Sequence, residues 1–186
     1  MKFPKFTVRR PVNVEQSSPL TSDVRIRTLV RQELPDLEWD GEYSHFRRMF
    51  QDTFQQAERG EAILWVAELI GIGLIGQIFV QLESHRNELA DGHSRAYLHA
   101  FRVRTPYRGQ GVGTRLLEVA ETDLIIRGYR RVCLNVGRDN PDAFRLYKHL
   151  GYRIVAAEPG NWSYIDHLGI RREVHEPAWR MEKEIR

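Results

Sequence analysis

A short loop with three glycines is the feature that most restricts how this chain can fold. The loop, Arg108-Gly109-Gln110-Gly111-Val112-Gly113, follows an apolar and aromatic run over residues 96–102 that predicts a strand. Apolar residues then recur four apart, which predicts a helix, at Val112, Leu116, Ala120 and Leu124. A loop between a strand and a helix N-terminus is suited to phosphate oxygens, because free backbone N–H groups and the positive end of the helix dipole meet there.

The spacing of the glycines excludes two common phosphate loops. No Gly-Lys-Ser/Thr follows, and the third glycine of the dinucleotide fingerprint falls one residue later than Gly113. A second stretch, with Gly71, Gly73 and Gly76, does match that fingerprint. The alternating β-rich residues 77–81 follow it, however, so we expect a hairpin turn there with Gly76 at a bulge or bend.

The remaining pattern predicts one domain of strands and helices over residues 24–186, after a tail or irregular lead-in over residues 1–23. Strands are expected over residues 24–30, 62–69, 74–82, 131–136, 152–157 and 178–185. Helices are expected over residues 39–56, 111–127 and from the N-cap Asn140 to about residue 150. Residues 84–94 are expected to form a polar loop, and residues 158–176 a long irregular connection.

Composition is ordinary for a soluble globular protein, with 41% hydrophobic and 28% charged residues among 186. No apolar run approaches the roughly 18 residues of a membrane span, and the net charge of +3 comes without a Lys/Arg run. We therefore expect no membrane or nucleic-acid partner. The single cysteine, Cys133, fits a reducing cytoplasm and a buried apolar position. His85 and His93 lack a third ligand at a recognisable spacing, so no metal is expected.

Two motifs together resemble the GNAT acetyltransferase superfamily. The first is Arg-x-x-Gly-x-Gly at Arg108–Gly113, and the second is the run from Asn140-Pro141-Asp142-Ala143 through Tyr147 to Gly151-Tyr152. The resemblance implies an α+β fold: a mixed, mostly antiparallel sheet flanked by helices, with a splayed pair of parallel strands that holds CoA. It also implies an N-acetyltransferase that uses acetyl-CoA as cosubstrate and acts on a primary amine by direct attack in a ternary complex.

The resemblance also assigns residues to the cofactor. The strand at Phe101, Arg102 and Val103 would pair its backbone with the pantetheine amides, Asn140 would contact the pantetheine arm, and Tyr147 would point at the CoA sulfur. The CoA pyrophosphate would be held by Arg108, Gly109, Gln110, Gly111, Val112, Gly113 and Thr114. Tyr147 also has the chemistry to donate a proton to the departing thiolate.

The sequence does not identify the general base. An amine with a pKa near ~10.4 loses its proton at pH 7 only at a cost of about 4–5 kcal/mol, so a base or a water chain is needed. Many family members carry a glutamate on the strand before the loop, but residues 96–99 hold no carboxylate. His99 is the candidate catalytic base there. Glu68, Glu83, Asp166 and His167 are further candidates.

The acceptor is expected to be a small-molecule or peptide amine bound by residues 33–56 and 158–176. Trp39, Trp162 and Tyr164 favour an apolar or aromatic part in it. Strand edges could support a homodimer. Two other readings stay open: a non-catalytic acyl-CoA-binding sensor on the same fold, and an RNA-associated module suggested by the sequence pI near 9.2.

Overall fold

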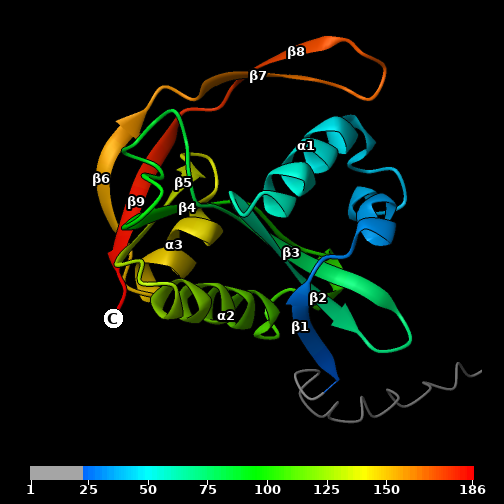
Figure 1. Ribbon diagram of the computed structural model, residues 1–186, viewed down its shortest axis with the longest axis horizontal. Helices are drawn as coiled ribbons and strands as arrows, with labels where there is room; N and C mark the ends of the chain where they lie inside the picture. The colour runs from blue at the N-terminus through cyan, green and yellow to red at the C-terminus, as the bar shows by residue number, and fades with distance from the viewer. Residues whose placement is uncertain (1–22) are drawn as a thin grey trace, which may run out of the picture.

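The computed structural model describes residues 23–186 around a seven-stranded mixed sheet (Figure 1). The strands lie in the order β1-β2-β3-β4-β5-β9-β6; β4 and β5 are parallel, and the other neighbours are antiparallel. Their bounds are β1 (Val24–Thr28), β2 (Ala62–Leu69), β3 (Gly73–Gln81), β4 (Arg95–Val103), β5 (Arg131–Gly137), β6 (Arg153–Glu158) and β9 (Ala178–Glu184). The tail expected over residues 1–23 lies outside the described residues, except for its last residue.

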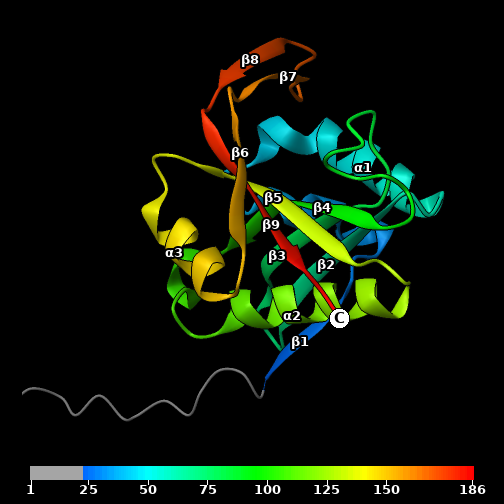
Figure 2. The same cartoon turned by 90° about the vertical axis from the view of Figure 1, so that its left-hand side faces the viewer.

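Helices cover both faces of this sheet (Figures 1 and 2). α1 (Arg47–Glu58) and the 3-10 helix η2 (Arg31–Glu38) lie on one face, and α2 (Val112–Ile126) and α3 (Pro141–His149) on the other. The sheet therefore has an apolar core on each side, and the central strand β3 is buried along nearly its whole length. This arrangement confirms the expected α+β class.

The parallel pair β4–β5 is joined over only part of its length. Its register runs from Arg95↔Arg131 to Leu98↔Leu134, and no pair follows within the described chain. Just beyond, Ala100 has a φ of 48°, and the β3–β4 register shifts between Gln77 and Phe79. An extra residue in one strand bends it and ends regular pairing. β4 and β5 consequently part after Leu98.

Residues 158–176 are not irregular, and that prediction is wrong. They contain the hairpin β7 (Asn161–Ile165) and β8 (Arg171–His175), which pairs only with itself. The Asp166 carboxylate holds its turn by accepting N–H bonds from Leu168 and Ile170, both at 2.9 Å. β8 was not predicted as a strand because its side chains are mostly polar. It pairs with the neighbouring β7 and does not pack in the core.

The helix predicted over residues 39–56 begins later than expected. Trp39, Asp40 and Gly41 have φ values of 47°, 60° and 98°, a left-handed run that no right-handed helix can include. The chain instead forms η2, then the short 3-10 helix η3 (Ser44–Phe46), and then α1. A bidentate ion pair from Arg47 to Glu38, at 2.6 and 2.8 Å, ties the start of α1 to the end of η2.

The other predicted helices and strands agree with the structure within two residues at each end. Gly71 and Gly73 lie in the β2–β3 turn with φ values of 81° and 112°, and the register shifts at Ala67/Glu68, opposite Gly76. The hairpin and bulge expected there are confirmed. Cys133 is fully buried, and its thiol donates to the Leu89 carbonyl at 3.0 Å, as expected of a small core residue.

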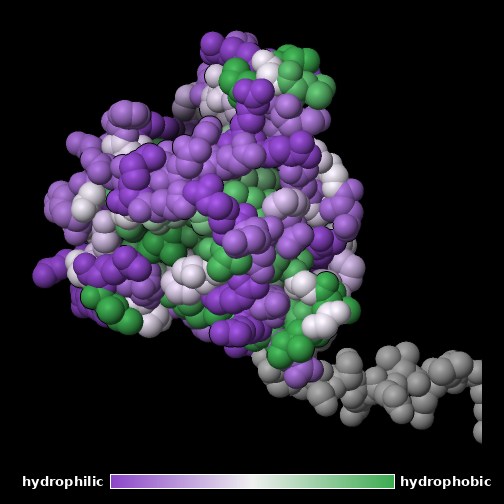
Figure 3. All heavy atoms as spheres, turned by 45° about the vertical axis from the view of Figure 1, so that its right-hand side comes forward, coloured by the Kyte–Doolittle hydropathy of each residue, from purple (hydrophilic) through white to green (hydrophobic). Residues whose placement is uncertain are grey.

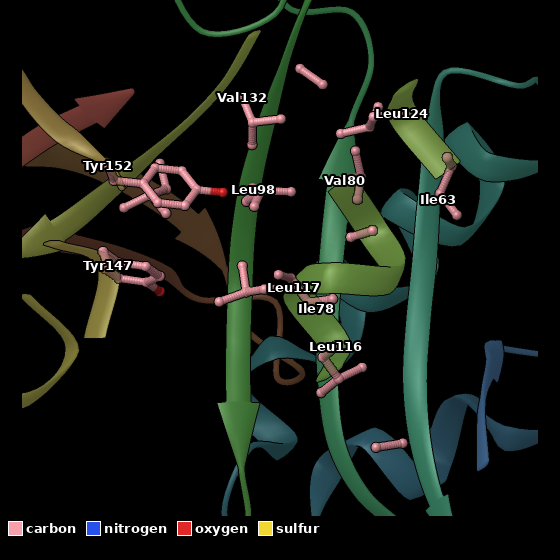
Figure 4. Packing of buried hydrophobic residues seen from close by; sticks show 14 of the residues in the cluster. Ile63, Ile78, Val80, Leu98, Leu116, Leu117, Leu124, Val132, Tyr147 and Tyr152 are labelled. Atoms are coloured by element: carbon pink, nitrogen blue, oxygen red, sulfur yellow. The ribbon is translucent and has the colours of Figure 1, made fainter. Parts of the chain in front are cut away.

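Helix α2 holds the loop in place through its buried face. Leu116 and Leu117 pack against Ile78 of β3 and Leu98 of β4 (Figure 4). The four-residue spacing that predicted the helix marks this face, because Val112, Leu116, Ala120 and Leu124 are all at most 1% exposed.

Leu116→Ala is expected to lower the free energy of unfolding by about 2–5 kcal/mol, because it removes buried methyl groups and leaves a cavity. Urea denaturation measures the change. Ile126→Ala on the same helix is the control, since Ile126 is 79% exposed and its loss should cost less than about 0.5 kcal/mol. Equal losses in the two variants would contradict this assignment of faces.

Candidate active site

The glycine loop closes onto the end of β4. A short 3-10 helix, η4 (Thr105–Tyr107), precedes Gly109 and Gly111, whose φ values of 72° and 83° are readily adopted only by glycine. Arg108 Nε donates to the Val103 carbonyl at 2.8 Å, and Gln110 Nε2 donates to the Pro106 carbonyl at 2.8 Å. These bonds fix the loop directly in front of α2.

The N-terminus of α2 is open. Its N-cap is Gly111, and no side chain caps the first N–H groups. A Cβ at Gly109 would meet no atom within 4 Å, whereas one at Gly113 would lie 2.9 Å from Cζ of Phe101. The helix therefore packs against β4 at Gly113 and leaves backbone N–H groups available beside Gly109. Such an end attracts an anion.

Helix α3 lies next to this opening and carries the second motif. Asn140 is its N-cap and accepts the Ala143 N–H at 3.1 Å, as predicted. Tyr147 is 7% exposed, with its ring centroid 6.2 Å from that of Phe101 and 5.7 Å from that of Tyr152 (Figure 4). Burial raises the pKa of Tyr147 well above its ordinary value, so the phenol keeps its proton.

A cavity of about 700 Å³ lies on the opposite face of the sheet, towards α1 and the β7–β8 hairpin. The two segments expected to shape a pocket both line it, with residues 45–53 from one and residues 158–162 from the other. Its aromatic lining consists of Phe46, Phe50, Phe79, Tyr97 and Trp162. Phe46 ties the hairpin to α1 through rings 6.4 Å away at Trp162 and 5.0 Å away at Tyr164.

The hairpin stands at the top of the molecule in each of the first three figures. Green hydrophobic residues appear there in Figure 3, above a mostly purple surface. The exposed apolar residues of the hairpin are Trp162, Ile165, Leu168 and Ile170. The hairpin therefore supplies one wall of the cavity while keeping apolar side chains in contact with solvent.

The polar groups of the cavity fall into a paired and an unpaired set. Glu158 is 7% exposed and accepts from Arg86 at 2.9 Å, with Arg180 at 3.2 Å. His99 stacks on Tyr97, with ring centroids 5.6 Å apart, and its buried Nε2 has no hydrogen-bond partner among the described residues. Burial, and less strongly the charge of Arg102, lower the pKa of His99 to about 4. The imidazole is therefore neutral near pH 7.

Comparison with known proteins identifies the family. Residues 28–152, which are 125 of the 186 residues, match the sequence profile of the Acetyltransferase (GNAT) family. The chain is a GNAT protein.

Two curated relatives and a solved structure are similar to it. The N-alpha-acetyltransferase 40 of Saccharomyces cerevisiae is 40% identical over 70 residues, and the uncharacterized N-acetyltransferase YesJ of Bacillus subtilis is 32% identical over 73. These matches cover 34% and 39% of this chain but only 25% and 41% of the relatives. The fold of Ard1 from Thermoplasma volcanium superposes with a TM-score of 0.67 at 18% identity, over 88% of this chain and 99% of that one.

Among the five proposed bases of this GNAT chain, His99 is the one that lines the cavity. Glu68 pairs with Arg27 at 2.8 Å on strands β2 and β1, away from the cavity lining, and the backbone of Glu83 forms a β-bridge with that of Asp91 just after β3. The Asp166 carboxylate accepts hydrogen bonds from the backbone of its own turn and from Arg172 at 2.8 Å, and His167 lies in the same turn. The assignment of His99 as base stays a prediction, now with a defined position.

Sequence patterns missed the side chain of Arg102, which was assigned only for its backbone. Regular alternation places residues 99, 101 and 103 on one face of a strand. The irregularity at Ala100 reverses the order, so that Phe101 and Val103 pack on the α2 side while Arg102 joins His99 in the cavity. No residue type in the strand marks a positive φ at Ala100, so the local sequence carries no signal for this reversal.

Within residues 23–186, no group of three or more His, Cys, Asp and Glu side chains could hold a metal ion. No helix of this part of the chain is long and apolar enough to span a bilayer.

His99 makes the stability of this GNAT domain dependent on pH. The unfolded histidine has a pKa near ~6.5 and the folded one about 4, so the unfolded state binds more protons between these values. The contribution of His99 to the free energy of unfolding is fully present above pH 6.5. It is lost as the pH falls, and by about pH 4 the loss reaches about 2–3 kcal/mol.

We therefore expect His99→Gln to lose less stability than the parent between pH 7 and pH 4.5, as measured by urea denaturation. His93→Gln serves as the control, because His93 is exposed in the 84–94 loop. Parallel pH profiles for the parent and His99→Gln would contradict a lowered pKa for His99.

Proposed function

We propose that this protein is an acetyl-CoA-dependent N-acetyltransferase that transfers acetyl to a primary amine by direct attack in a ternary complex. The observation that carries the proposal is the parting of β4 and β5 after Leu98 beside the open N-terminus of α2. The place where the two strands separate, here called the gap, lies next to the glycine loop on one face of the sheet. On the other face it lies next to the aromatic cavity. Membership of the GNAT family supports the same chemistry.

The loop fits the CoA part of acetyl-CoA. Gly109 and Gly111 are in conformations suited to glycine, there is free space where a Cβ of Gly109 would lie, and Arg108 is exposed beside them. The N–H groups from Gly109 to Thr114 would hold the pyrophosphate, with Gln110, Val112 and Gly113 between them. The backbone of Phe101–Val103 and the side chain of Asn140 would hold the pantetheine arm. Acetyl-CoA would supply the thioester carbonyl that the amine attacks; the acetyl group would pass to the amine, and CoA would leave as the thiol.

Tyr147 is the proposed proton donor. Its hydroxyl stays protonated at neutral pH because burial opposes the phenolate, and its ring packs beside Phe101 at the edge of the gap. A phenol held there can give its proton to a departing sulfur and recover it from solvent.

His99 is the proposed acceptor of the amine proton. Its Nε2 is buried without a partner among the described residues, and the ring is neutral near pH 7. A pKa of about 4 makes the neutral ring a weak base, so it would hold the amine proton only transiently. A cytoplasmic location and a homodimer remain predictions from the sequence.

The cofactor assignment is tested by thermal denaturation with acetyl-CoA. At 100 times its dissociation constant, acetyl-CoA should add ~2.7 kcal/mol to the stability of the parent, which is a rise of roughly 5–11 °C in Tm. Arg108→Ala should reduce this rise strongly. Arg127→Ala, at the far end of α2, is the matched control and should keep it. No rise in the parent would exclude the CoA assignment.

Tyr147→Phe is expected to lower kcat about 100-fold or more while the KM for acetyl-CoA stays within a few-fold, since only the proton donor is lost. Tyr152→Phe is the control. The Tyr152 hydroxyl donates to Glu121 at 2.7 Å, so this variant should lose stability and keep kcat. Binding of acetyl-CoA without turnover of any amine in the parent would favour the acyl-CoA sensor.

A further inference from the structure

Arg102 is a cation in the wall of the cavity, and the charge of Glu42 acts on it without forming an ion pair. Its guanidinium lies over the rings of Tyr43 at 4.1 Å and Phe46 at 5.0 Å. Among the described residues it forms no ion pair, and its buried Nη1 has no hydrogen-bond partner. Burial of this kind lowers the pKa of the guanidinium. A buried donor left unpaired is costly, so its retention needs a reason.

The two aromatic rings restrict what can reach this arginine. The guanidinium lies over both rings in cation–π contacts, which offset part of its desolvation. The N–H groups of a guanidinium project from the edge of its plane as a fork, and the buried Nη1 of Arg102 is the unpaired one. A planar carboxylate matches that fork with two parallel hydrogen bonds. A phosphate carries more charge and calls for more cations than Arg102 alone.

None of the other charged side chains that line the cavity pairs with Arg102. Arg86 and Glu158 neutralise each other at 2.9 Å, and Glu176 is exposed on the hairpin side. Two more polar atoms of the lining are buried without partners, namely Nε2 of His99 and Oδ1 of Asn135. The cavity thus presents an unused cationic donor beside a neutral imidazole, within aromatic walls.

We propose that the acceptor amine also carries a carboxylate and an apolar or aromatic group, as an amino acid does. Its carboxylate binds the edge of Arg102, its amine lies at His99, and its side chain occupies the aromatic part of the cavity. This inference rests on the proposed N-acetyltransferase function. A polyamine would bring further positive charge next to Arg102 and is disfavoured.

The test compares L-phenylalanine with L-phenylalaninamide, which has the same shape but no carboxylate. In the parent, kcat/KM should be about tenfold or more higher for L-phenylalanine, because a buried charge pair is lost with the amide. Arg102→Gln should bring the ratio close to one, and Arg102→Lys should restore it only in part, since lysine lacks the fork. Arg48→Gln is the charge-matched control: Arg48 is exposed on α1 outside the cavity lining, so the ratio should persist.

Calorimetry separates this inference from the proposed function. Titration of acetyl-CoA tests the cofactor, and titration of N-acetyl-L-phenylalanine against its amide tests the carboxylate site without turnover. Normal acetyl-CoA binding with equal or better use of the amide, or of spermidine, would overturn the carboxylate site alone. Preferential binding of the carboxylate that is lost in Arg102→Gln would support it. Absent acetyl-CoA binding would overturn the proposed function, and with it the assignment of this ligand as acceptor.

Discussion

The left-handed conformation of Ala100 is the constraint on which the site depends. An alanine at φ 48° costs about 1–2 kcal/mol relative to ordinary strand geometry, and the surrounding sheet has to hold it there. Its position marks where β4 leaves β5 and where the alternation of side chains reverses. Without that reversal, Phe101 would point into the cavity and Arg102 into the α2 core, where a guanidinium has no partner.

The sheet therefore separates the glycine loop from the aromatic cavity, except where β4 and β5 part after Leu98. On one face, Gly113 lets α2 approach the Phe101 ring closely, which sets the helix N-terminus at the end of β4. On the other face, His99 and Arg102 line the aromatic cavity. In the proposed acyl transfer the two reactants would meet where the parallel strands have separated. The apolar contacts of Leu116 with the sheet hold α2, and with it the loop, in this position.

The parts that the sequence predicts well are those with local physical causes. The glycine loop, the four-residue period of α2 and the Asn140 cap each depend on residues within a few positions of one another. The errors have non-local causes. The left-handed run at Trp39 is stabilised by tertiary burial, and β8 is a strand only because β7 lies beside it. The orientation of Arg102 depends on an irregularity that β3 shares, which no window on β4 alone could show.

Two charged side chains of the cavity, Glu158 and Arg102, differ in whether the protein supplies them with an ion-pair partner. Glu158 is as deeply buried as any carboxylate of the cavity lining, and the fold provides it with Arg86 and Arg180. The same fold places two aromatic rings against Arg102 and, within residues 23–186, gives it no ion pair, although the charge of Glu42 acts on it. A fold that can compensate one buried charge with two partners has the means to compensate another. That it provides Arg102 with none, on a surface open to a ligand, is why its missing partner is best assigned to the acceptor.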